Sequence, residues 1–190
     1  MKKILVVDNY DSFIHNLVQW IREEEEISFE ICHNNYIPWD RLQEFHGIVL
    51  SPGPGIPQQA GEMLRLISQM KNKLPIFGVC LGHQALAVES GGELKKMLRP
   101  YHGIASKPKV LYKKGMWRNV TRGVKVGRYH SWTVRPHSLP EEWRITAIDN
   151  EENILSMEHK QYPLWGVQFH PESYMTKGGR VMLKNWIKLL

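Results

Sequence analysis

The sequence is poor in cysteine and has no long apolar run. Its 190 residues include only Cys32 and Cys80, which excludes a disulfide-rich secreted scaffold and a four-cysteine zinc site. No apolar stretch approaches the roughly 20 residues that a membrane-spanning helix needs, and the apolar start over residues 4–7 is too short for a signal peptide. We therefore expect a protein of the reducing cytoplasm that has no membrane partner.

Several signatures of ligand binding are also missing. There is no Gly-x-x-x-x-Gly-Lys phosphate loop, no dinucleotide-binding glycine pattern and no His-Glu-x-x-His metal motif, so we expect no metal and no cofactor in this chain. The 25 Lys and Arg residues exceed the 19 Asp and Glu residues, which gives a net charge of +6. The cations accompany no nucleic-acid-binding motif, so a solvated surface is favoured over a nucleic-acid site.

The first half of the chain has a regular alternation of apolar runs and amphipathic segments. Continuous apolar runs predict buried parallel strands, and Ser12 is placed to cap the first helix. Strands are expected near 3–8, 29–32, 47–50 and 75–79, and further helices near 61–70 and 81–90.

The second half changes to short alternating stretches before a final helix near 178–189. These stretches predict antiparallel strands near 108–112, 124–129, 143–149, 153–158 and 164–169. The whole pattern predicts an α/β fold with an open, mostly parallel central sheet, helices on both faces and a flanking antiparallel strand region, in one domain over residues 1–190. Ligands bind beyond the carboxyl ends of such strands, where the loops 9–12, 51–55 and 79–81 fall.

Gly78-Val79-Cys80-Leu81-Gly82 stands at one of these strand-to-helix junctions. It has the Gly-x-nucleophile-x-Gly form of a nucleophile elbow, in which glycines allow a sharp turn and the helix N-terminus favours a thiolate. The backbone N–H of Leu81 is then placed to bind a developing oxyanion. The alternative interpretation is a small cysteine buried in a packed turn.

A cysteine nucleophile needs a base, and nine histidines compete for this role. His170 ends an apolar strand and precedes Pro171 and Glu172. A histidine at a strand end with a carboxylate two residues later can form a base and its orienting acid. The alternative is a histidine in an ordinary turn.

Ser51-Pro52-Gly53-Pro54-Gly55 is a rigid segment that leaves backbone N–H groups uncovered. Gly53 is a candidate for a second oxyanion donor. The alternative interpretation is a stiff strand-to-helix connection.

Taken together, these segments resemble the class I, or triad-type, glutamine amidotransferases, and most of all the small component II of anthranilate synthase and of aminodeoxychorismate synthase. The similarity runs nearly from end to end. The matching segments are Val7-Asp8-Asn9-Tyr10-Asp11-Ser12-Phe13, Ser51-Pro52-Gly53-Pro54-Gly55, Pro75-Ile76-Phe77-Gly78-Val79-Cys80-Leu81-Gly82-His83-Gln84, Arg128-Tyr129-His130-Ser131 and Gly166-Val167-Gln168-Phe169-His170-Pro171-Glu172-Ser173.

The resemblance implies that Cys80 attacks the side-chain amide of L-glutamine, that His170 activates water and that Glu172 orients His170. It implies an oxyanion hole made by Gly53 and Leu81. The implied substrate-binding residues are Gly53, Pro54, Gly55, Gln84, Ser131 and Trp132. The residues alone indicate only a cysteine acyl-transfer enzyme, and glutamine as the substrate comes from the resemblance.

The resemblance also implies a partner, because ammonia released into water at neutral pH becomes mostly ammonium, a poor nucleophile. We expect a separate chorismate-using synthase subunit in a hetero-oligomer, with Mg²⁺ needed by that partner. Anthranilate formation is the leading expectation, and aminodeoxychorismate formation is the alternative. A Cys-His-Glu γ-glutamyl hydrolase without ammonia transfer is the runner-up, and a nucleic-acid-binding protein is the competing class.

Three positions depart from the family pattern. Ile14-His15 and Ile104 stand where the family commonly has Thr-Tyr and Lys, and they weaken the assignment of a particular partner. Trp132 stands where the family commonly has Leu or Arg, and its bulk affects the shape of the glutamine pocket.

Overall fold

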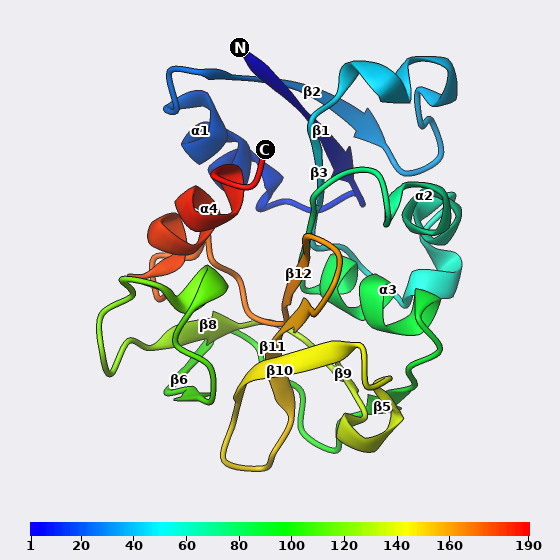
Figure 1. The fold of residues 1–190 in the computed structure, drawn as a ribbon. Helices are drawn as coiled ribbons and strands as arrows, with labels where there is room; N and C mark the ends of the chain where they lie inside the picture. Colours follow the sequence, from blue (N-terminus) through cyan, green and yellow to red (C-terminus); the bar gives the residue numbers. More distant parts are fainter.

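A computed structural model describes residues 1–190 and places an eight-stranded sheet at the centre of the molecule (Figure 1). The strand order is β2-β1-β3-β4-β12-β11-β10-β7. The first five strands in this order are parallel and the last three add on antiparallel. The bounds are β1 Lys2–Asp8, β2 Ile27–His33, β3 Gly47–Leu50, β4 Ile76–Val79, β7 Lys109–Val110, β10 Trp143–Ile148, β11 Ile154–His159 and β12 Leu164–Val167.

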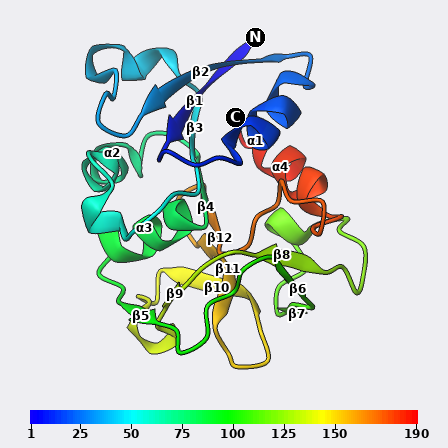
Figure 2. The same ribbon diagram turned by 180° about the vertical axis from the view of Figure 1, so that it is seen from behind.

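Four α-helices cover the two faces of this sheet. Helices α1 (Ile14–Arg22) and α4 (Gly179–Ile187) lie together on one face, and α2 (Met63–Met70) and α3 (Leu81–Glu89) lie on the other (Figures 1 and 2). Because successive side chains of a strand point to opposite faces, β1 contributes to both cores. Its Leu5 and Val7 pack with α2 and α3, and its Ile4 and Val6 pack with α1 and α4. The expected α/β sheet with helices on both faces is therefore confirmed.

One local prediction was wrong. Ser12 does not cap a helix, because α1 begins only at Ile14 with Phe13 at its N-cap and no side-chain cap. Asp11, rather than Ser12, binds a backbone donor ahead of this helix, since its carboxylate accepts a hydrogen bond of 3.0 Å from the N–H of Phe13. The helix expected near 61–70 is confirmed as α2, which begins at Met63 because Gly61 has a φ of +54° that is not helical.

The second half also holds strands that the alternating pattern did not predict. Two-stranded sheets pair β5 (Leu94–Lys96) with β9 (Trp132–Val134) and β6 (Ile104–Ser106) with β8 (Val126–Arg128), of which only β8 was expected, near 124–129. The unexpected strands β5, β6 and β9 have only three residues each, which is too short for a periodicity to be read. Short 3₁₀ turns lie at Trp39–Glu44, Pro57–Gln59, Gly115–Trp117 and Pro136–Ser138.

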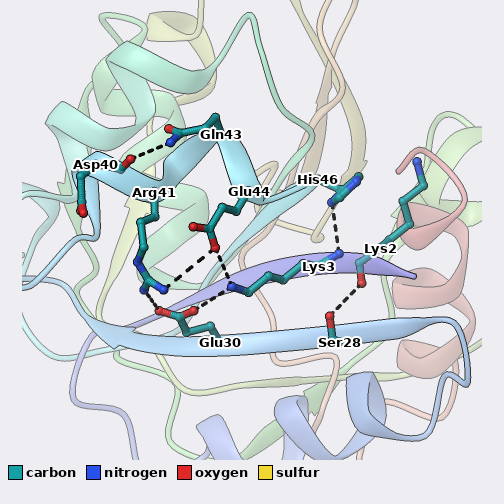
Figure 3. Close-up of polar contacts among 9 residues, drawn as sticks. All are labelled: Lys2, Lys3, Ser28, Glu30, Asp40, Arg41, Gln43, Glu44 and His46. Atoms are coloured by element: carbon teal, nitrogen blue, oxygen red, sulfur yellow. Dashed lines mark hydrogen bonds and ion pairs between the residues drawn. The ribbon is translucent and has the colours of Figure 1, made fainter.

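The edge strand β2 is tied to the rest of the sheet by a network of charged groups (Figure 3). Lys3 on β1 forms ion pairs of 3.0 Å with both Glu30 and Glu44, and Arg41 pairs with Glu30. The hydrogen bond from Lys3 is the main reason that the pKa of Glu30 lies below its ordinary value. The network holds the 3₁₀ turn Trp39–Glu44 against β1 and β2.

The sheet order places four neighbouring parallel strands, β1, β3, β4 and β12, with their carboxyl ends at one edge. The three loops singled out in the sequence leave the first three of these strands, and Gln168 to His170 leave the fourth. Segments far apart in the sequence therefore meet at the position where open α/β sheets bind ligands. No helix has the length and apolar character that a bilayer crossing requires.

Candidate active site

Cys80 sits in a strained turn between β4 and α3. Its φ of +52° and ψ of −97° lie in a region that L-residues rarely adopt. Two glycines make the turn possible: a Cβ on Gly78 would lie 2.5 Å from the carbonyl carbon of Gly82, and a Cβ on Gly82 would lie 2.6 Å from the carbonyl oxygen of Leu50. The backbone N–H of Cys80 bonds the carbonyl of Val167 on β12 at 2.8 Å. The predicted elbow geometry is present.

His170 and Glu172 form a buried pair. The Nδ1 atom of His170 lies 2.6 Å from Oε1 of Glu172, and the two residues are 3% and 4% exposed. Because an ionised carboxylate only accepts, Nδ1 carries the proton of this bond. The other ring nitrogen, Nε2, is buried and has no hydrogen bond of good geometry. The backbone N–H of His170 bonds Gly127 at 2.9 Å, which anchors the segment.

The pKa of His170 is raised well above its ordinary value. Burial by itself lowers it, but hydrogen bonds and charge interactions with Cys80 and Glu172 outweigh the burial. Cys80 and Glu172 thus both act on the same imidazole, and the structure brings Cys80 together with the His170–Glu172 pair, which begins 90 positions later in the sequence. The pair favours an imidazolium poised between a sulfur and a carboxylate.

A cavity of about 150 Å³ opens in front of Cys80. It is lined by Gly53, Pro54, Gly55, Cys80, Leu81, Gln84, Tyr129, His130, Ser131 and Trp132. Every residue that the resemblance assigned to the oxyanion hole or to the substrate lines this cavity. His170 and Glu172 do not line it. They lie behind the cavity, where the ring of Tyr129 packs edge-on against His170 with 4.9 Å between the ring centroids.

Gly53 lies where only a glycine fits. An added Cβ would be 2.5 Å from both Cβ and the carbonyl oxygen of Asn9. Ser51 fixes Asn9 in turn, because the Ser51 hydroxyl accepts from the Asn9 N–H at 2.9 Å and the Ser51 carbonyl accepts from Nδ2 at 2.9 Å. The backbone N–H of Gly53 has no acceptor within the chain. Leu81 stands in the first turn of α3, where backbone donors also lack intrahelical acceptors.

The glutamine amidotransferase class-I family model matches residues 5–189. The chain belongs to the class-I glutamine amidotransferase family.

Individual relatives agree with this family membership. The chain is 40% identical to the Bifunctional protein TrpGD of Thermotoga maritima, matching all of this chain and 32% of that protein's length. It is 40% identical to the Aminodeoxychorismate/anthranilate synthase component 2 of Bacillus subtilis, over 97% of this chain and 95% of the relative. A crystal structure from Thermoplasma acidophilum, described as that of a candidate GMP synthase protein, superposes with a TM-score of 0.88 at 27% identity and covers 100% of this chain and 94% of that one.

In this glutamine amidotransferase, one wall of the cavity is held by amide side chains. The Nε2 group of Gln84 donates to the carbonyl of Trp132 at 2.9 Å and to Oε1 of Gln168 at 3.1 Å. Gln168 in turn donates to Sγ of Cys80 at 3.7 Å. Because the Nε2 group of Gln84 is used in these bonds, its side-chain carbonyl is the part of the amide that is left to accept a hydrogen bond from a ligand in the cavity. Trp132 lines the cavity, and its backbone carbonyl accepts the hydrogen bond from Gln84.

The carbonyl of Trp132 is also the end of a buried series of hydrogen bonds that begins at Asp149. Asp149 binds Nη1 of Arg128 at 2.7 Å, Nε of Arg128 donates to Nε2 of His130 at 3.1 Å, and Nδ1 of His130 bonds the Trp132 carbonyl at 2.8 Å. A carbonyl only accepts, so Nδ1 carries the proton and Nε2 is free to accept from Arg128. Burial, followed by the charge of Arg128, lowers the pKa of His130 to about 3. His130 is therefore a neutral ring in one fixed tautomer.

Sequence reasoning missed part of this arrangement. It singled out the motif Arg128-Tyr129-His130-Ser131 but assigned a role only to Ser131. The partner of Arg128, Asp149, has no motif of its own and could be found only through the tertiary contact. Cys32 is partly buried, and desolvation, followed by the charges of Glu30 and Asp8, raises its pKa to about 12, so its thiolate is suppressed.

No cluster of three or more His, Cys, Asp or Glu side chains is arranged to hold a metal ion.

Proposed function

We propose that Cys80 hydrolyses L-glutamine through a γ-glutamyl thioester. The observation that carries the proposal is the strained cysteine at the mouth of a small cavity, with the His170–Glu172 pair directly behind it. The sulfur attacks the side-chain amide carbon, and the carbonyl oxygen becomes an oxyanion. The backbone N–H groups of Gly53 and Leu81 are the available donors for this charge.

The imidazolium of His170 then gives its proton to the departing nitrogen, which leaves as ammonia. In the second half of the reaction the neutral imidazole of His170 removes a proton from water, and the hydroxide attacks the thioester carbon. The C–S bond then breaks, which restores the Cys80 thiolate beside the imidazolium of His170, and the new γ-carboxylic acid of glutamate gives its proton to solvent. Glu172 stabilises the imidazolium and holds its tautomer throughout. Gln84, Ser131 and Trp132 bind the head group of glutamine, with the free carbonyl of Gln84 accepting from an N–H donor of the substrate.

This chemistry needs no cofactor in the chain itself. The thiol has to stay reduced, which supports a cytoplasmic location, and both cysteines are free. We assign Mg²⁺ to the partner rather than to this protein.

The acceptor of ammonia is proposed to be a chorismate-using synthase subunit that makes anthranilate. The name of the Bacillus subtilis relative, which includes both anthranilate and aminodeoxychorismate synthase, supports this class of partner. Aminodeoxychorismate formation remains the second candidate for the same reason. A γ-glutamyl hydrolase that keeps no partner would share the cysteine chemistry and differ only in the absence of ammonia transfer.

Reconstitution tests these candidates together. The purified chain is mixed with an anthranilate synthase component I or an aminodeoxychorismate synthase component I from the same organism, with chorismate, glutamine and Mg²⁺, and the aromatic product is identified. We expect glutamine-dependent anthranilate. Ammonia release that neither synthase component stimulates would leave the hydrolase as the better description.

A further inference from the structure

The cations of this chain are concentrated in one stretch. Residues 94–140 contain no Asp or Glu, although they hold nearly half of the Lys and Arg residues. The cations of this stretch are Lys95, Lys96, Arg99, Lys107, Lys109, Lys113, Lys114, Arg118, Arg122, Lys125, Arg128 and Arg135. Only Arg128 and Arg135 form an ion pair within the chain. The others therefore have no carboxylate partner of their own.

Part of this charge gathers around two adjoining hollows. One, of about 190 Å³, includes Lys113 and Arg122 in its lining. The other, of about 640 Å³, includes Arg122, Lys125 and Lys177. Residues 121–124 line both hollows, and neither lining contains an acidic side chain. We call the face made by Lys113, Arg122, Lys125 and Lys177 the basic groove.

The basic groove borders the catalytic segment. Lys125 directly precedes β8, whose Gly127 pairs with His170, and the N–H of Gly127 bonds Oγ1 of Thr176 at 2.9 Å. The hydroxyl of Thr176 donates to the carbonyl of His170 at 2.7 Å. In Figure 1 the green strand β8 lies beside the orange chain that leads from β12 to α4. A partner seated in the groove would therefore lie next to the proposed site of ammonia release.

The groove also has the features of a protein-binding surface rather than of a purely solvated one. Its four cations are exposed and unpaired, and Tyr174, which is 88% exposed, stands at its edge beside Val124 and Met175. Exposed aromatic rings and arginines are enriched at interfaces. Unbalanced charge of one sign favours a partner of the opposite sign and speeds the encounter with it.

We propose that the basic groove docks an acidic surface of the synthase subunit that receives the ammonia. The inference rests on the proposed function, because it takes that subunit to be the occupant. It adds which face of this chain the subunit covers, and the charge that the covering surface carries. The groove brings the two proteins together beside His170 without using any residue of the glutamine cavity.

A charge-reversal triple tests the proposal. The variant Arg122→Glu/Lys125→Glu/Lys177→Glu changes three groove cations. The matched control Lys73→Glu/Lys160→Glu/Lys188→Glu makes the same change in net charge at exposed, unpaired lysines that line neither hollow. Titration calorimetry measures the Kd for the purified synthase subunit in low and in high salt, and glutaminase activity is measured with and without that subunit.

We expect the groove variant to bind at least about tenfold more weakly at low salt, and the control to stay within about twofold of the wild type. Glutaminase activity without the partner should be unchanged in both, and stimulation by the partner should be lost only in the groove variant. If the triple variant does not fold, the Kd of the wild type is measured at increasing salt. A Kd that does not rise with salt would overturn the proposal, because the contact is argued from charge.

Equal binding by the groove variant and the control would overturn the docking inference while leaving the proposed function intact. Failure of the wild type to bind any synthase subunit would instead count against the proposed function. Loss of oligonucleotide binding or of self-association in the groove variant, with synthase binding preserved, would assign the groove to nucleic acid or to a second copy of the chain.

Discussion

The two nitrogens of His130 make contacts that can be removed one at a time. A His130→Gln substitution places an amide near the former Nε2, where it can still accept from Arg128, but it loses the donor to the Trp132 carbonyl. A His130→Asn substitution does the reverse, because its amide lies near the former Nδ1. Comparing the two variants therefore separates the effect of the His130 bond to the Trp132 carbonyl from the effect of its bond to Arg128.

The expected magnitudes follow from the contacts. The Trp132 carbonyl keeps its bond from Gln84 in both variants, so His130→Gln loses one neutral hydrogen bond, which lowers stability by about 1 kcal/mol and Tm by about 2–4 °C. The same free energy lost from the cavity wall on glutamine binding would raise KM about fivefold. In His130→Asn the buried guanidinium of Arg128 loses an acceptor, and its Nη2 already has none. That loss should cost about 2 kcal/mol and lower the Tm by about 4–8 °C, with KM nearly unchanged.

Steady-state glutaminase kinetics and thermal unfolding of the same preparations provide the assay. The expected difference is that KM rises only in His130→Gln, and that Tm falls further in His130→Asn than in His130→Gln. A purely structural role for His130 would move Tm in both variants and leave KM alone. Equal changes of KM and Tm in the two variants would refute the assignment of separate tasks to the two nitrogens.

Other predictions concern the two cysteines, the elbow and pH. Cys80→Ser should abolish glutaminase activity with an unchanged circular dichroism spectrum, whereas Cys32→Ser should leave kcat within about twofold, because its thiolate is suppressed. Gly82→Ala should lower the free energy of unfolding by about 1–3 kcal/mol in denaturant titration, since its Cβ meets the Leu50 carbonyl; a neutral effect would contradict the close packing. Burial lowers the pKa values of both His83 and His130 to about 3. The unfolded chain therefore binds more protons between about pH 6.5 and pH 3, so stability should fall as pH falls through this window, by up to about 1.4 kcal/mol per pH unit for each histidine. Urea titrations at a series of pH values would show this slope, and His130→Gln should reduce it.

The parts of the fold that sequence predicted are those with a strong local signal. Continuous apolar runs revealed β1, β3 and β4, because strands buried on both faces have little polar alternation. The three-residue strands β5, β6 and β9 have no such signal, and they form because a partner strand supplies their hydrogen bonds. Ser12 has the right residue type for a cap but the wrong position, since Asp11 competes for the same backbone donors.

The candidate site shows the same division. Cys80, His170 and Glu172 could be predicted because each stands in a motif whose chemistry is local, a tight glycine turn or a histidine two residues before a carboxylate. Asp149 could not, because its task depends on Arg128, a residue 21 positions away that folding brings within 2.7 Å. The glycines of the site are intermediate between residues that a local motif predicts and residues whose role depends on tertiary contacts. The sequence shows that Gly53 and Gly82 are glycines, but only the structure shows that Asn9 and Leu50 leave no room for a Cβ. The tight approach of three strand ends is therefore what places the backbone donors around the Cys80 sulfur.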